Sequence, residues 1–151
     1  MAKIVNIKGR QVFDSRGNPT IEAIVFSDDG HQASAIVPSG ASTGAHEAFE
    51  LRDKESKDYL GKSVLTAVEN INGVILKKIN NFDVFNQREI DNNLIELDGT
   101  KQKSNLGANS MLSVSIAICK LAAKSKGMSL FKYLGGSKAN QLPLPLMNII
   151  N

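Results

Sequence analysis

The sequence predicts an α+β fold, in which a three-stranded antiparallel meander is followed by a helical bundle packed on one face of the sheet. Two observations predict this fold. First, residues 3–37 contain three apolar, strand-like segments separated by short turn signals, and short turns join antiparallel neighbours. Second, from residue 62 onward the apolar side chains recur at helical spacing. Because the strands precede the helices, the helices are expected to form a layer on the sheet.

The strands are predicted at residues 3–14, 20–27 and 31–37. The cluster from Asp14 to Pro19 marks the first turn, because its glycine tolerates a positive φ, and Arg16 within it is expected to be structural. Asp28-Asp29-Gly30 is a tight hairpin signal. Residues 20–27 carry apolar side chains at odd and even positions, so both faces of this middle strand are expected to be partly covered.

The first two helical segments are predicted at residues 62–79 and 86–97. An apolar stripe runs through 62–79, and Gly73 is expected to break or kink that helix. Asn86 followed by Glu89 is typical of a helix N-cap. Asp98-Gly99 then ends the second segment, because glycine favours the turn after a helix.

The strongest helix is predicted at residues 109–126, where Gly127 ends it. A short helix at 129–134 follows and stops at Gly135-Gly136. Small side chains along 109–126 permit close packing against a neighbour. Two adjacent stripes run along this helix: Leu112, Ser115, Cys119 and Ala122 on one, and Met111, Val114, Ile118 and Leu121 on the other.

The composition is that of an ordinary globular protein. Apolar residues make up 42% of the 151 residues, enough to bury the core of one domain. The 18 basic and 15 acidic residues are interspersed, so the net charge of +3 does not indicate a nucleic-acid surface. Cys119 is the only cysteine, which excludes an intrachain disulfide. No apolar run reaches transmembrane length and residues 1–15 lack a signal-peptide pattern, so a cytoplasmic protein with no membrane partner is expected.

Residues 38–47 form the most informative segment. They contain two glycines, two serines, a threonine and a histidine, without any large apolar side chain. Such a loop can move, and it can bring hydroxyls and backbone groups close to a small anion or a metal. A flexible surface linker is the alternative interpretation.

Other catalytic patterns are absent from the sequence. Residues 38–47 contain no Gly-Lys-Ser/Thr and so are not a phosphate loop, and no Gly-x-Gly-x-x-Gly turn follows a strand. His31 and His46 lack zinc-ligand spacing, and each alone is interpreted as a surface or loop residue. Cys119 with His46 would be a poor nucleophile and base, because the thiol lies midway along an apolar helix.

The carboxylates form no obvious metal cluster. Three of them are expected at a helix start, where they favour the helix dipole and pair with Arg52 or Lys54: Glu47, Glu50 and Asp53. Three more are expected on a solvated helix face: Asp91, Glu96 and Asp98. A divalent cation needs several converging oxygens, and nothing in this pattern forces such a cluster.

Four motifs in order resemble enolase: residues 14–20, 38–47, 106–110 and 142–151. The resemblance runs from near residue 3 to residue 151. It implies an amino-terminal capping domain at residues 1–136, with residues 137–151 as a linker and the start of a β/α barrel. The barrel itself is missing from the 151 residues, and it would supply the catalytic base and acid and the acidic magnesium ligands.

The resemblance implies a magnesium-dependent carbon–oxygen lyase that interconverts 2-phospho-D-glycerate and phosphoenolpyruvate in glycolysis. Two Mg²⁺ per active site would stabilise the negative charge that builds up when a proton beside a carboxylate is removed. By resemblance, Ser42 is the loop ligand to the second Mg²⁺, and Arg10 and Glu22 match dimer contacts, although each is read on residues alone as a surface charge. The mobile active-site loop would comprise Ser39, Gly40, Ala41, Ser42, Thr43, Gly44 and His46.

The fragment alone is expected to be inactive, to hold no specific Mg²⁺ and to contain no catalytic residue, and the full-length protein is expected to be a homo-oligomer. The alternative function is a noncatalytic binding or assembly module derived from an enolase cap.

Overall fold

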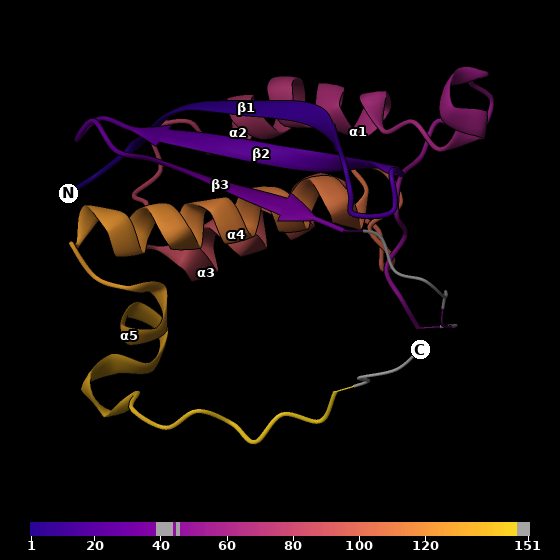
Figure 1. Ribbon diagram of the computed structural model, residues 1–151. Coiled ribbons are helices and arrows are strands. Elements are labelled where there is room, and N and C mark those ends of the chain that lie inside the picture. Colours follow the sequence, from indigo (N-terminus) through magenta and orange to yellow (C-terminus); the bar gives the residue numbers. More distant parts are fainter. Residues whose placement is uncertain (39–43, 45, 148–151) are drawn as a thin grey trace.

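The computed structural model describes residues 1–38, 44 and 46–147 and confirms the α+β fold (Figure 1). Strands β1 (Ile4–Phe13), β2 (Pro19–Ser27) and β3 (Gln32–Val37) form an antiparallel sheet in chain order. The helical elements that follow the sheet are α1 (Leu65–Asn70), α2 (Leu76–Ile79), α3 (Gln87–Asp98), α4 (Ala108–Ser125) and α5 (Leu130–Gly135). Short helical turns lie at Asp58–Gly61 and Gly136–Lys138.

The β1–β2 turn is held by Asp14. Its Oδ1 accepts hydrogen bonds from the backbone N–H groups of Arg16 at 2.8 Å and Asn18 at 2.9 Å, and Gly17 has a φ of 74°. The hydrogen bond from Asn18 lowers the pKa of the Asp14 carboxyl, and Arg16 lowers it further although burial opposes this. The Arg16 guanidinium lies 3.6 Å from the other carboxylate oxygen, in agreement with a structural role.

The helices cover one face of the sheet. Figure 1 shows α4 running along β2 and β3, with α1 and α2 beside β1. The helix-covered face of β2 carries Ile21, Ala23 and Val25, which are fully buried. Each large apolar side chain buried in this way contributes about 1.5–3 kcal/mol. The core therefore lies between the sheet and the helices.

The helix predicted at 62–79 does not end at Gly73. A π-helical stretch, Ile71–Ile75, joins α1 to α2 and contains that glycine. The stretch packs closely on β1, because a Cβ at Gly9 would lie 2.9 Å from the Cβ of Ile71. The Asn72 side chain accepts from the N–H of Gly9 at 2.8 Å and donates to its carbonyl at 3.2 Å. A π-helical turn contains one residue more than an α-helical turn. Here that turn places the side-chain amide of Asn72 against the backbone of β1.

Helix α4 buries one of the two predicted stripes more deeply than the other. Met111, Val114, Ile118 and Leu121 all lie in the core. On the other stripe, Leu112 is 48% exposed, whereas Ala122 is fully buried. The same stripe also makes a polar contact with α3, where the Ser115 hydroxyl donates to Asp91 at 2.7 Å.

Helix α3 begins at Asn86 as predicted, but its side chain does not cap the backbone. Instead, its amide donates to the carboxylate of Glu89. The Asn86–Glu89 signature thus locates the helix start correctly, but the two side chains bond to each other and not to the backbone N–H groups of the first turn.

Residues after α5 leave the core. Leu142, Leu144 and Leu146 are each more than nine-tenths exposed on a segment without regular structure (Figure 1). The proposed domain boundary at residue 136 stays a prediction. Across the described residues, no helix combines the length and the apolar character required to cross a membrane.

Candidate functional site

Of the predicted loop, residues 38–47, the structure describes Pro38, Gly44, His46 and Glu47. Ser39, Gly40, Ala41, Ser42 and Thr43 lie outside the described residues, so the magnesium-ligand assignment of Ser42 stays a prediction. Gly44 and His46 are described, and His46 lies in a turn. The chain before the loop ends in β3, whose last residue, Val37, accepts a hydrogen bond from the Thr20 hydroxyl.

The segment after the loop, residues 46–53, is not a helix, which corrects the prediction of a helix start at Glu47. Several of its backbone groups bond to distant segments. The N–H of Phe49 donates to the carbonyl of Gln102 at 2.7 Å, and the N–H of Ala108 donates to the carbonyl of Phe49 at 2.8 Å. Because these groups are already paired across the fold, they cannot form the i to i−4 bonds of a helix.

Asp53 does serve a helix start, but that of α1. Its two carboxylate oxygens accept from the N–H of Leu65 at 2.7 Å and of Thr66 at 3.2 Å, the unpaired donors at the helix N-terminus. Burial opposes ionisation of Asp53, yet the hydrogen bonds from Thr66 and Leu65 outweigh it and lower its pKa. The predicted pairing of Glu50 with Arg52 is confirmed, at 2.8 Å.

The loop between α3 and α4 is organised by Asp98. The sequence predicted a solvated carboxylate, but Asp98 is only 1% exposed. Its oxygens accept from the N–H groups of Thr100 at 3.0 Å, Asn105 at 3.1 Å and Leu106 at 2.8 Å, and from the Thr100 hydroxyl. The pKa of Asp98 is lowered, because these bonds outweigh the effect of burial. A carboxylate at the end of α3 thus folds the next eight residues into a compact loop.

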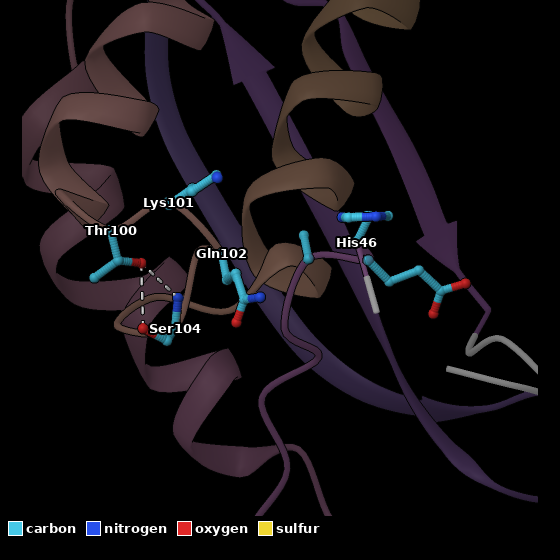
Figure 2. A pocket seen from close by; sticks show the side chains of 7 residues that line it. His46, Thr100, Lys101, Gln102 and Ser104 are labelled. Atoms are coloured by element: carbon cyan, nitrogen blue, oxygen red, sulfur yellow. Dashed lines mark hydrogen bonds between the residues drawn. The ribbon is translucent and has the colours of Figure 1, made fainter. Parts of the chain in front are cut away.

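This loop and the segment that begins at His46 line an open pocket of about 510 Å³. Figure 2 shows His46 on one wall, with Thr100, Lys101, Gln102 and Ser104 on the other. The Ser104 hydroxyl donates to that of Thr100 at 3.2 Å, so these two groups are partly occupied with each other. The His46 imidazole, the Lys101 ammonium and the Gln102 amide thus offer hydrogen-bonding groups to a small ligand in this pocket.

The described residues do not form a metal centre by themselves. No three His, Cys, Asp or Glu side chains come together anywhere in residues 1–38, 44 and 46–147. Cys119 is partly buried on α4, and burial, with a smaller effect of Asp91, raises the pKa of its thiol, which disfavours the thiolate nucleophile.

Arg10 and Glu22 are a cross-strand pair on the sheet face opposite the helices. They are register partners on β1 and β2, and the Arg10 Nε lies 2.5 Å from a Glu22 oxygen. Glu22 is 7% exposed, which corrects its interpretation as a surface charge, whereas Arg10 stays accessible. Strand pairing brings the two side chains together, and the guanidinium covers the carboxylate. Their role as dimer contacts stays a prediction.

The family model described as "Enolase, N-terminal domain" matches residues 4–134. The chain belongs to the enolase N-terminal domain family. The match spans the sheet, the loop of residues 38–47 and helices α1 to α4, so the sequence resemblance is confirmed at the level of the family. Within this enolase domain, sequence reasoning missed the role of two residues: the buried Asp98, and Asn109, whose side chain hydrogen-bonds both backbone groups of Leu51. The Asp98-Gly99-Thr100 run at the end of α3 and the Leu106–Ser110 motif were the available signals.

Proposed function

We propose that this enolase domain is the capping part of a magnesium-dependent, cytoplasmic glycolytic enolase, which interconverts 2-phospho-D-glycerate and phosphoenolpyruvate. The family match over residues 4–134 carries the proposal. In it, the chain supplies the loop from Ser39 to His46, and a barrel supplies the base, the acid and the remaining magnesium ligands. The assembled enzyme is proposed to be a homo-oligomer with Arg10 and Glu22 at its contact.

The anchoring of the loop supports this proposal. A loop that closes over a substrate needs fixed ends, so that closure delivers its groups to one place. The chain before the loop is strand β3, and the chain after it is bonded to residues 102, 108 and 109. When bound, Mg²⁺ would polarise the substrate carboxylate. The chain's own contribution would be the Ser42 hydroxyl as a hard oxygen ligand and the exclusion of water by the closed loop.

The proposal is tested by Ser42→Ala in the chain joined to an enolase barrel as one polypeptide. Loss of a ligand that is bound mainly in the reacting complex lowers kcat, and we expect a fall of about a hundredfold or more without a change in the unfolding temperature. Ser137→Ala, an exposed serine after α5, is the matched control and should leave kcat unchanged. Unchanged turnover by Ser42→Ala would refute the assigned role, and an inactive wild-type fusion would contradict the enolase function.

A further inference from the structure

Asn109 acts as a hydrogen-bonding partner for the backbone of Leu51. Asn109 lies in the first turn of α4 and is 4% exposed. Its Nδ2 donates to the Leu51 carbonyl at 3.0 Å, and its Oδ1 accepts from the Leu51 N–H at 3.1 Å. One side chain thus satisfies both backbone groups of a residue 58 positions away. Removing such a side chain leaves polar groups unpaired away from water, which is costly.

The surroundings of Asn109 are built around this contact. Gly107, just before α4, has a φ of +87°, and a Cβ there would lie 2.5 Å from both Asn109 Oδ1 and the Leu51 Cβ. Only glycine permits this approach. Phe49, two residues before Leu51, is held by the backbone bonds to Gln102 and Ala108. The segment is therefore fixed at two successive points, three and five residues after His46.

We propose that Asn109 is a positioning residue, which holds residues 49–51 on the N-terminal turn of α4 and thereby sets the place of His46 and Gly44. Its consequence for catalysis rests on the proposed enolase function. In an enzyme, displacing a positioned group by about 1 Å costs on the order of a hundredfold in rate. Asn109 touches no reacting atom in this proposal and acts only through the segment that it holds.

Asn109→Ala removes both hydrogen bonds to Leu51. Ser110→Ala is a closely matched control, because Ser110 is the adjacent buried polar residue and its hydroxyl donates to the carbonyls of Leu106 and Gly107 rather than to Leu51. Asn109→Asp keeps the acceptor for the Leu51 N–H but places a second carboxylate oxygen against the Leu51 carbonyl. Because two acceptor oxygens then face each other away from water, this variant should not restore wild-type protection at Leu51.

Amide hydrogen exchange in the 151-residue chain tests the anchoring directly. In Asn109→Ala, exchange at Leu51 should accelerate about tenfold or more, as expected for the loss of one hydrogen bond, while exchange at Ile118 in the core stays slow. Ser110→Ala should leave Leu51 protected. Equal exchange at Leu51 in the wild type and Asn109→Ala overturns the proposal. Equal acceleration at Ile118 overturns it as well, because the effect would then be global.

Kinetics of the chain joined to an enolase barrel test the catalytic consequence. Asn109→Ala should lower kcat about ten- to a hundredfold with a smaller change in KM, and Ser110→Ala should stay near the wild type. Wild-type kcat in Asn109→Ala overturns the positioning role. If the wild-type fusion is inactive, the proposed enolase function fails, whereas the exchange measurement still decides whether Asn109 anchors the segment.

Discussion

Replacing Asp98 by asparagine should destabilise the domain much more than most changes of charge at a helix end. Asp98 is the last residue of α3 and is buried. One of its oxygens accepts two bonds from Thr100, and the other accepts the N–H groups of Asn105 at 3.1 Å and Leu106 at 2.8 Å. Asparagine keeps one acceptor oxygen and turns the other into a donor, so two donors lose their partner and face an NH₂ group.

The magnitude follows from the two lost bonds. Hydrogen bonds to a charged group contribute about 1.5–3 kcal/mol each. Removing a negative charge from the C-terminal end of α3 returns about 0.3–1 kcal/mol, because the helix dipole disfavours it there. The net loss for Asp98→Asn is therefore about 2–6 kcal/mol, which lowers the melting temperature of a domain of this size by on the order of 10 °C.

The loss should also depend on pH. The pKa of Asp98 is lowered in the folded protein, since its hydrogen bonds outweigh the effect of burial. A carboxyl with a lowered folded pKa stabilises the fold above its unfolded pKa, about 3.9, and loses this contribution as the pH falls through the folded value. The stability difference between the wild type and Asp98→Asn should be largest near neutral pH and shrink below about pH 4.

Urea unfolding followed by circular dichroism, at neutral pH and near pH 3, measures both effects. Glu96→Gln is the control, because Glu96 is exposed on the same helix and its replacement should change stability by less than about 0.5 kcal/mol. A loss below about 1 kcal/mol for Asp98→Asn at neutral pH, or a difference that does not vary with pH, would refute the reasoning.

Two further predictions concern α4. Gly107→Ala should lower the free energy of unfolding by about 2–4 kcal/mol. The φ of +87° at this position disfavours a side chain, and the added Cβ would lie 2.5 Å from atoms of Leu51 and Asn109. Thermal unfolding that shows a loss under about 1 kcal/mol would contradict this prediction. Alkylation of Cys119 at pH 8 should be slower than that of free cysteine and should reach the same rate in urea, because burial raises its pKa. Equal rates in the folded protein would exclude this protection.

The parts of the fold that sequence reasoning predicted are those set by neighbouring residues. The turn at Asp14–Pro19 and the hairpin at Asp28-Asp29-Gly30 depend on glycine and on local Asp hydrogen bonds, and both are found as expected. The end of α3 at Gly99 likewise follows from its left-handed φ of 70°. The spacing of the apolar residues and the positions of glycine and other turn residues thus located the strands and helices.

The errors arose where distant segments decide the outcome. Residues 46–53 have the acidic composition of a helix start, yet their hydrogen bonds go to residues 102, 108 and 109. Asp98 has the spacing of an exposed residue, but the returning loop buries it. Glu22 is covered by Arg10 only once β1 and β2 pair. None of these contacts is visible in a local pattern, because each joins segments that the fold brings together.

The most direct test of the proposed function is the steady-state conversion of 2-phospho-D-glycerate to phosphoenolpyruvate, with Mg²⁺ present, by three purified samples. These are the 151-residue chain, an enolase barrel, and the two joined as one polypeptide. The joined protein should turn over substrate while each part alone does not, because the loop and the base and acid would then act on one substrate. Activity of the isolated chain, or a barrel that works equally well without it, would contradict the proposed division of roles between the cap and the barrel.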